Sequence, residues 1–358
     1  MDKQKLHIGY TCKVENYNGD IWASFTVPDK NIYQVRIATG GAIGNIININ
    51  KNELLSPSYK DEKTDRIIQW TIWGNHLKYP IPGYDDFETR YNLTQGGDER
   101  GNFSITKHVT LYDNGIDVWS TPIDNWKIKL QQHFKGGVSA LTRYRLIGPG
   151  VLLVRRVIQI DNITLNNQVK VLGNTYIEAW TPVRKGPYNA CALSIDSNNS
   201  PNWWYDANSN LPSYPNFKIT DTNGYCIAYN HMDINTEVFG LVFGKKDIVI
   251  KKYKDDIGGN YVLNFMSWDT GFGILPGINV DMLDNSDIID VHNIIVLGKG
   301  ITETFMNTIK QYVEDIPAPT IYKKFSSITG TDLVNIISNF KSLSKYPGLR
   351  TDKLGSYI

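Results

Sequence analysis

The amino-acid sequence predicts an all-β protein built as one large antiparallel β-sandwich, with helices at its C-terminal end. Short runs of alternating apolar and polar residues recur along most of the 358-residue chain, and Gly, Asn, Asp or Pro residues bound them. Residue types that favour strands are abundant, including 21 Tyr, 12 Phe and 9 Trp. The chain shows no regular alternation of strand and helix patterns, which argues against a doubly wound parallel sheet.

The strand pattern begins with "DIWASFTV" at 20–27, where Ile21, Ala23 and Phe25 share one face. Similar runs, separated by turn signals such as "GPG" and "DTNG", have the spacing of a sandwich. A different segment, 194–218, is long, polar and aromatic, and we expect an ordered loop folded over a sheet face there. The further predicted strands are 33–39, 66–73, 103–112, 115–121, 127–134, 140–147, 151–160, 168–180, 190–195, 217–220, 225–230, 237–243, 247–253, 261–268 and 290–298.

Helical periodicity occurs only near the C-terminal end. Residues 301–316 place apolar side chains on one stripe, with Thr302 as the expected N-cap and "PAP" as the terminator. Residues 331–343 repeat the pattern. The predicted domains are a β-sandwich at 1–300 and a helical extension, packed on the sandwich, at 301–358.

Charge and hydropathy argue against several partners. The 37 basic and 36 acidic residues leave a net charge of +1, so no basic field favours nucleic acid or an anionic membrane surface. No apolar run reaches the roughly 18 residues of a membrane span. The N-terminal residues lack the apolar core of a signal peptide, which favours a cytoplasmic location. Cys12, Cys191 and Cys226 are far apart, and we interpret them as small buried hydrophobic residues.

Most basic pairs, such as Arg155–Arg156 and Lys245–Lys246, are interpreted as solvated strand ends or turns. The stretch "RYR" is an exception, because Arg143 and Arg145 share one face of an expected strand.

Four stretches mix aromatic residues with amides and charges, as sugar-binding surfaces do: "ETRYNLTQGGD" at 88–98, "YIEAWTP", "PNWWYD" and "MSWDTG". We predict that the first forms part of a cleft wall, although a loop that ties two sheets together is the alternative. The expected substrate-binding residues are Asn92, Gln95, Asp98, Arg145, Trp180, Trp204, His231 and Trp268.

Proton transfer next to an oxygenated sugar carbon needs a base and a cation in one cleft. His76 and His133 lie at the ends of expected strands, and Glu178 alternates with two aromatic residues that would raise its pKa. Arginine is suited to neutralise a uronate carboxylate or a developing oxyanion. Structural roles for the same residues stay open at this point. The expected catalytic residues are His76, His133, Glu178, Arg90 and Arg143, with Arg145 as the alternative cation.

Three stretches carry a family resemblance. "YQVRIATGGAIGNIININKNELL", "TRYNLTQGGD" and "ALTRYRLIGPGVLLVRRVIQI" resemble, respectively, an early strand–turn–strand segment, the elements beside the sugar cleft, and the paired central strands of galactose-mutarotase-like proteins. Gln95 stands where that family has a histidine before a glycine pair. The resemblance covers about residues 20–300. It implies the supersandwich fold and an epimerase-like or lyase-like activity on a carbohydrate.

The sequence leaves a second interpretation, a non-catalytic carbohydrate-binding or self-assembling structural protein. Near-neutral charge and many Asn and Tyr residues suit assembly through polar and aromatic contacts, and a homo-oligomer fits either interpretation. No cofactor and no metal centre is predicted, because none of the six histidines forms a metal-ligand motif. Asp98, Asp206 and Asp269 are the carboxylates that would hold calcium without such a motif.

Overall fold

The described residues of the computed structural model form strands, one α-helix, a short 3₁₀ helix (η2, Ile219–Asp221) and the turns that join some of them. The strands are almost all antiparallel and form three sheets within these residues, which confirms the predicted fold class. The described residues are 9–13, 20–26, 32–37, 43–48, 52–55, 69–75, 88–92, 105–112, 115–121, 123–124, 134–165, 168–169, 172–184, 190–195, 201–206, 216–230, 232–233, 235–251, 256–258, 260–268, 271–283 and 287–322.

The two smaller sheets follow the chain differently. The five-stranded sheet keeps the chain order, with β1 (Gly9–Lys13), β2 (Asp20–Thr26), β3 (Ile32–Ile37), β4 (Ile43–Asn48) and β5 (Asn52–Leu55). The seven-stranded sheet runs in the order β10 (Ile123–Asp124), β7 (Glu88–Asn92), β6 (Gln69–Asn75), β14 (Leu172–Arg184), β23 (Gly271–Leu283), β22 (Asn260–Trp268) and β17 (Asn216–Lys218).

The thirteen-stranded sheet contains most of the described core. Its main path is β16 (Pro201–Asp206), β15 (Ala190–Ile195), β18 (Tyr225–Tyr229), β19 (Glu237–Val242), β24 (Ile288–Lys299), β12 (Val151–Leu165), β11 (Phe134–Gly148), β9 (Gly115–Thr121) and β8 (Ile105–Tyr112). The strands β13 (Gln168–Val169), β20 (Val249–Lys251), β21 (Asp256–Gly258) and β25 (Thr320–Tyr322) attach beside this path.

The hairpin β11–β12 lies at the centre of this sheet. Its two strands have 15 residues each, and the turn between them places Gly150 at φ 68°, a conformation that glycine adopts at little cost. The "GPG" signal therefore marks a real hairpin turn. β9 pairs with β11 and β24 pairs with β12, so both central strands have neighbours on both edges.

Helix α2 (Glu303–Asp315) confirms the helix predicted at 301–316. The hydroxyl of Thr302 accepts a hydrogen bond from the N–H of Phe305 at 3.2 Å, as expected of the N-cap. At the other end, Lys246 donates to the carbonyl oxygens of Glu314 and Ile316 at 2.9 and 3.0 Å. The second predicted helix, 331–343, lies outside the described residues.

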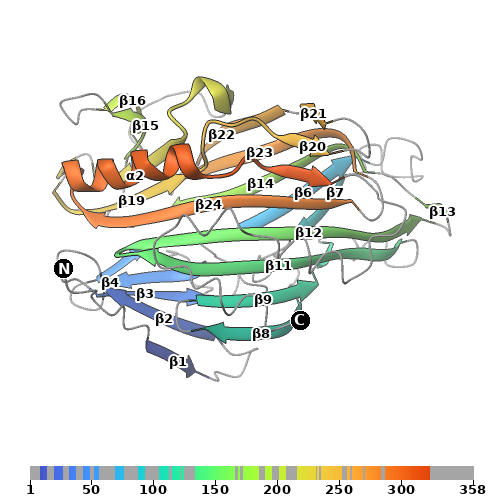
Figure 1. The fold of residues 1–358 in the computed structure, drawn as a ribbon, viewed down its shortest axis with the longest axis horizontal. Coiled ribbons are helices and arrows are strands. Elements are labelled where there is room, and N and C mark those ends of the chain that lie inside the picture. The colour runs from blue at the N-terminus through green and yellow to red at the C-terminus, as the bar shows by residue number, and fades with distance from the viewer. Residues whose placement is uncertain are drawn as a thin grey trace.

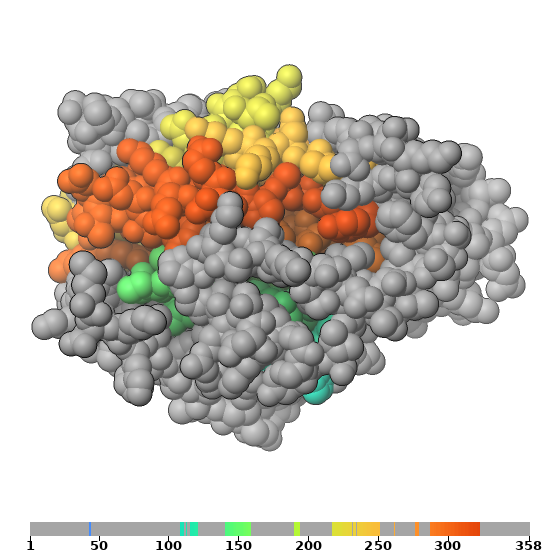
Figure 2. Space-filling model, viewed as in Figure 1, coloured from blue at the N-terminus to red at the C-terminus, as the bar shows by residue number. Residues whose placement is uncertain are grey.

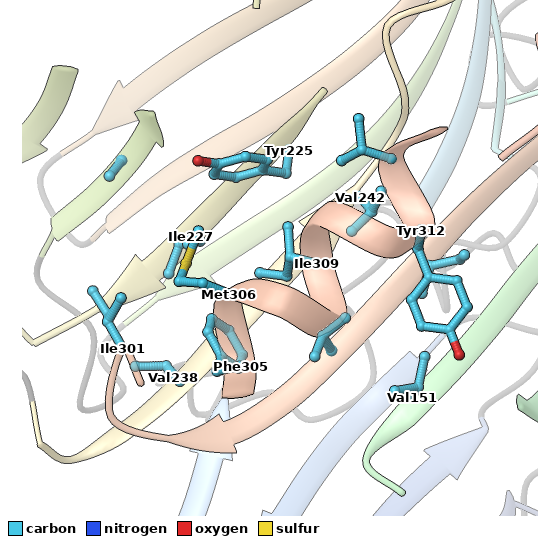
Figure 3. Packing of buried hydrophobic residues seen from close by; sticks show 14 of the residues in the cluster. Val151, Tyr225, Ile227, Val238, Val242, Ile301, Phe305, Met306, Ile309 and Tyr312 are labelled. Carbon is cyan, nitrogen blue, oxygen red and sulfur yellow. The ribbon is translucent and has the colours of Figure 1, made fainter. Parts of the chain in front are cut away.

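The apolar stripe of α2 packs on β19 and β24 (Figure 3). Two glycines bring the helix close to the sheet. A Cβ atom at Gly240 would lie 2.7 Å from Cδ1 of Ile309, and one at Gly298 would lie 2.9 Å from Phe305. Figure 1 shows the helix on the near face of the sheet, and Figure 2 shows β11 and β12 (green) below it on the same face.

The seven-stranded sheet packs behind the thirteen-stranded sheet. Tyr261 on β22 and Ile278 on β23 are paired neighbours, and each is 1% exposed. Tyr261 lies beside Asn293 of β24, on the opposite face of that strand from His292. The thirteen-stranded sheet is therefore covered on one face by the seven-stranded sheet and on the other face by α2.

Several predicted elements need correction. The segment 194–218 contains strand β16, which pairs with β15 through Cys191–Tyr205 and Ala192–Trp204, so the prediction of a loop is wrong there. Pairing with a neighbouring strand outweighed the Asn and Pro content that suggested a loop. Residues 88–92 likewise form β7, between β6 and β10. Strand β23 was not predicted, because Gly and Pro interrupt its alternation.

Other predictions fall partly or wholly beyond the described residues. The strand expected at 127–134 lies outside them except for Phe134, which begins β11. The domain boundary at 300 stays a prediction. After α2 the chain returns to the sheet, where β25 pairs with both β20 and β24.

The packing of α2 predicts a matched pair of substitutions. Ile309→Ala should lower the free energy of unfolding by about 2–5 kcal/mol, because it removes a fully buried side chain and leaves a cavity. Lys310→Ala, at the neighbouring exposed position, should change it by less than about 0.5 kcal/mol. Urea unfolding monitored by circular dichroism gives both values. Equal effects at the two positions would contradict the docking of the helix.

Candidate functional site

A buried row of charged side chains crosses four strands of the thirteen-stranded sheet. The register pairs Asp117 on β9 with Arg143 on β11, Arg143 with Arg155 on β12, and Arg155 with His292 on β24. Paired residues share a face, as do residues two apart in a strand. The same face therefore also carries Arg145 and Asp290. We call these six residues the polar row: Asp117, Arg143, Arg145, Arg155, Asp290 and His292, all of them buried.

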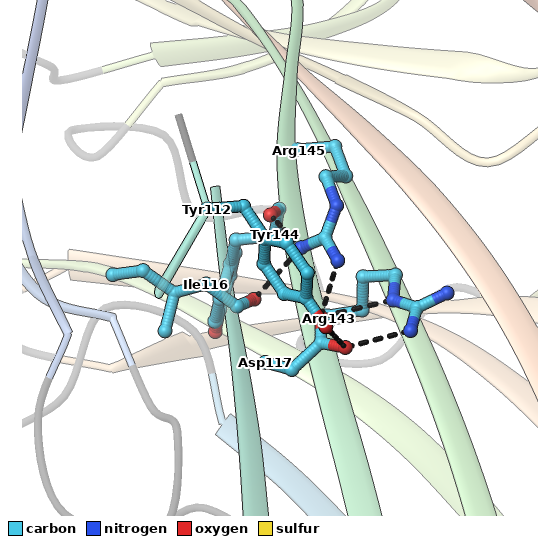
Figure 4. A network of polar contacts seen from close by, with 6 residues as sticks. All are labelled: Tyr112, Ile116, Asp117, Arg143, Tyr144 and Arg145. Carbon is cyan, nitrogen blue, oxygen red and sulfur yellow. Dashed lines mark hydrogen bonds and ion pairs between the residues drawn. The ribbon is translucent and has the colours of Figure 1, made fainter. Parts of the chain in front are cut away.

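Asp117 is the acceptor for three neighbouring side chains (Figure 4). Nε and Nη2 of Arg143 donate to its two oxygens at 2.9 and 2.6 Å, and Nη2 of Arg145 lies 2.7 Å from Oδ1. The Tyr112 hydroxyl also donates to it, at 3.2 Å. Burial alone would raise the pKa of Asp117, but the two arginines outweigh burial and hold it below its ordinary value. Asp117 is therefore ionised at neutral pH.

Arg145 is fixed by more than the carboxylate. Its Nη1 donates to the carbonyl oxygens of Ile116 and Tyr144 at 3.2 and 2.7 Å. Its guanidinium lies over the ring of Tyr112, 4.1 Å from the centroid, in a cation–π contact. Burial lowers the pKa of Arg145, and Asp117 opposes that effect.

Arg155 and Asp290 form the second ion pair of the polar row. Nε and Nη2 of Arg155 donate to the two carboxylate oxygens at 2.9 and 2.6 Å, the bidentate geometry that makes such pairs strong. Nε2 of His292 lies 3.9 Å from Oδ1 of Asp290. Burial lowers the pKa of His292 to about 4, against the attraction of Asp290, so the imidazole is neutral at neutral pH.

Half-buried aromatic residues border the polar row. Tyr112 on β8 lies beside Arg145, and Trp119 on β9 and Tyr322 on β25 pack against an apolar cluster on the same face. Tyr322 pairs with Ile288, two residues from Asp290, and burial and Asp290 raise the pKa of Tyr322. One sheet face thus combines charged groups with aromatic rings. The apolar cluster consists of Leu141, Val157 and Ile288.

The opposite face of β12 carries a second buried arginine. Nη2 of Arg156 donates to the Tyr144 hydroxyl at 3.3 Å, and burial lowers the pKa of Arg156 to about 10. Burial also raises the pKa of Tyr144 to about 12. Arg155 and Arg156 are each 1% exposed, so their interpretation as a solvated strand end is wrong. They lie within a strand that is covered on both faces. Lys245 and Lys246 are exposed, as predicted.

The structure brings two of the predicted site residues together. Arg143 and Arg145 share one face, as the alternation predicts, and both contact Asp117. The predicted catalytic and binding roles of these two residues stay predictions.

Other predicted residues belong to the seven-stranded sheet. The register pairs Asn92 on β7 with Thr71 on β6, and Thr71 with Glu178 on β14. Arg90 lies two residues from Asn92 in β7, and Trp180 lies two residues from Glu178 in β14. The backbone therefore places these four residues on one face of the same sheet, which is a different sheet from that of Arg143 and Arg145.

The remaining predicted residues are single positions. Trp204 lies in β16 and Trp268 ends β22. The structure describes the backbone of Trp204, of Trp268 and of the four residues named above. Outside the described residues lie His76, Gln95, Asp98, His133 and His231.

Sequence reasoning missed Asp117, Arg155, Asp290 and His292. A usable signal existed, because each interrupts an otherwise apolar strand: "GIDVWST", "VLLVRRVIQI" and "DVHNIIVLG". Charged residues at such positions need opposite charges nearby. Which oppositely charged residue contacts each of them, however, depends on how the strands pair.

In the described part of the chain, no group of three or more His, Cys, Asp or Glu residues is arranged to hold a metal ion. The helix in this part is too short and too polar to cross a membrane. Cys191 and Cys226 are buried, as predicted, and neither forms a disulfide bond with another described residue.

The shared carboxylate predicts a large effect of one isosteric substitution. Asp117→Asn should lower the free energy of unfolding by about 3–5 kcal/mol, because it leaves two buried guanidinium groups without their counter-charge. Asp233→Asn is the matched control and should change it by less than about 0.5 kcal/mol. Asp233 is exposed, and its Oδ1 accepts from the Asn235 N–H, a bond that an amide oxygen retains. Urea titration measures both, and similar values would refute the importance of the ion pairs.

His292 predicts a dependence of stability on pH. Its pKa is about 4 in the folded protein and 6.5 ordinarily, so between these values the unfolded chain binds a proton that the folded chain does not. Stability should therefore fall on acidification across this window, by on the order of 3 kcal/mol from this residue. His292→Asn should flatten the profile. The check is urea unfolding of both proteins across about pH 4.5–6.5; parallel profiles would exclude His292 as the cause.

Comparison with known proteins gives structural likenesses and no match in sequence. No protein-family model matches the chain, and no curated protein matches it. The chain is similar to a 4-α-glucanotransferase from Thermococcus litoralis, at 7% identity and a TM-score of 0.39, over 82% of this chain and 40% of that one. It therefore spans less than half the length of that protein.

Two similar structures match over most of both chains. One is a galactose 1-epimerase from Lactobacillus acidophilus, at 8% identity and a TM-score of 0.45, over 83% of this chain and 100% of that one. The other is a putative aldose 1-epimerase from Klebsiella pneumoniae, at 10% identity and a TM-score of 0.44, over 91% and 92%. Structures of galactose-mutarotase-like proteins are thus among those that the chain is similar to.

Proposed function

We propose that the protein is carbohydrate-active and that its ligand binds over the polar row, between the aromatic residues that border it. The observation that supports this proposal is the juxtaposition, on one sheet face, of hydrogen-bonding charged groups with Tyr112, Trp119 and Tyr322. Sugars have polar edges and apolar faces, so a surface of this composition suits them. The long paired strands beneath hold the groups rigidly.

The chemistry that we assign to the site is proton transfer next to an oxygenated carbon, epimerase-like or lyase-like. Arg143 would neutralise the oxyanion that develops. The proposed bases are His76, His133 and Glu178. The other proposed contributors are Arg90 and Arg145 as cations, and Asn92, Gln95, Asp98, Trp180, Trp204, His231 and Trp268 as sugar-binding residues.

A non-catalytic carbohydrate-binding protein is the second candidate, and one observation favours it. Asp117 and Asp290 are both held by arginines, which keep their pKa values below the ordinary range. A carboxylate so strongly stabilised as an anion is a poor base. These two acids would then serve to position the arginines.

Sugar binding is tested by thermal-shift titration with neutral and acidic mono- and oligosaccharides. At least one sugar class should raise the melting temperature of the wild-type protein. Trp119→Leu should raise the Kd for that class about tenfold, because it removes a stacking surface. Phe217→Leu, which alters a half-buried aromatic residue of the other sheet, should leave the Kd unchanged. A panel without any shift would overturn the proposal.

NMR in D₂O separates the two candidates once a sugar is found. In D₂O an epimerase that acts at a C–H bond should replace that hydrogen by deuterium, and a lyase should eliminate it. A 1-epimerase should instead speed the interconversion of the two anomers, and NMR detects all three outcomes. A binding protein causes none of them.

A further inference from the structure

We infer that the ligand is an acidic sugar and that Arg143 receives its anionic group. The inference rests on the proposed function and names the substrate class of the same site. The anionic group is a carboxylate, a sulfate or a phosphate, which share the oxygen geometry that a guanidinium binds.

Two arginines of the polar row share one carboxylate. Arg143 and Arg145 share Asp117, with contacts of 2.6–2.9 Å from the first and 2.7 Å from the second. Arg155, by contrast, has its own carboxylate in Asp290. Among the described residues, this end of the polar row therefore holds two guanidinium groups and one carboxylate. An anionic ligand group would complete the charge balance there.

Arg143 is the least buried member of the polar row. Arg143 is 8% exposed, and the other five members of the polar row are 1–5% exposed. Its Nε and Nη2 donate to Asp117, while its Nη1 makes no hydrogen bond or ion pair with another described residue. Figure 4 shows Nη1 on the side of the guanidinium away from Asp117. Arg143 can thus bind a second oxyanion without releasing the first.

The neighbouring strand brings a like charge beside Arg143. The residue paired with Arg143 on β12 is Arg155, so two like charges lie directly opposite each other across the sheet. Such an arrangement is destabilising by itself. An anion at Nη1 of Arg143 would reduce the repulsion, and Trp119 lies on the same face, one row away, where a sugar ring would reach.

The ligand side of the test uses the wild-type protein. Glucuronate, glucose 6-sulfate and glucose 6-phosphate are each titrated against glucose, with the melting temperature as the readout. Glucuronamide serves as the neutral counterpart of glucuronate. Sodium sulfate and sodium phosphate, matched in ionic strength by sodium chloride, show whether a free anion suffices. At least one acidic sugar should bind about tenfold more tightly than its neutral counterpart.

The protein side compares two substitutions that each remove one positive charge. Arg143→Gln should weaken binding of the acidic sugar about tenfold more than it weakens binding of glucose. Lys245→Gln is the control, because Lys245 is exposed and follows β19 at the other side of the sheet. Arg143→Lys keeps the charge but loses the planar guanidinium. Its Kd for the acidic sugar should therefore lie between those of Lys245→Gln and Arg143→Gln. If Arg143→Gln does not fold, the test uses Arg143→Lys instead. The readout is then the preference for glucuronate over glucuronamide, which Arg143→Lys should reduce.

Each outcome separates this inference from the proposed function. Equal binding of acidic and neutral sugars, or acidic-sugar binding that Arg143→Gln does not weaken, overturns the inference and leaves carbohydrate binding standing. Free sulfate or phosphate that binds through Arg143 without any sugar binding overturns the proposed function and leaves an anion site. A protein that binds none of these probes contradicts both.

Discussion

The ion pairs inside the thirteen-stranded sheet are the constraint on which the rest of the structure depends. Arg143 and Arg155 lie in strands that have neighbours on both edges and cover on both faces. A guanidinium buried there without a counter-charge would cost several kcal/mol. Asp117 and Asp290 supply those charges from β9 and β24. A shift of register by one residue would turn each arginine to the opposite face, so the ion pairs also specify how four strands align.

The two faces of the thirteen-stranded sheet pack against different parts of the protein. One face meets the seven-stranded sheet, and its buried polar groups include Arg156, which donates to the Tyr144 hydroxyl. The other face changes character along the strands, from the apolar surface under α2, through the polar row, to the apolar cluster around Leu141. The polar row therefore lies between two packed regions. Such a position fixes the directions of its side chains, as a binding or catalytic site requires.

Local features of the fold could be predicted, because they depend on nearby residues. Strand β9 was predicted to the residue, and the N-cap of α2 was identified as Thr302, since alternation and capping are short-range effects. Strand β16 was missed because Trp204 and its polar neighbours form a strand only through pairing with β15. The site was predicted in part for the same reason. Alternation put Arg143 and Arg145 on one face, but their shared partner, Asp117, lies 26 residues from Arg143.

The ion pair of Arg155 and Asp290 joins residues 135 positions apart, which has a consequence for the nascent chain. Strand β12 leaves the ribosome long before β24, and in that interval one of its edges is unpaired. An apolar edge of 15 residues would invite other chains to add strands to it. A charged residue in its middle discourages that association until the native partner arrives. We therefore expect Arg155 to limit such association before Asp290 is synthesised, and in the folded protein its ion pair with Asp290 joins β12 to β24.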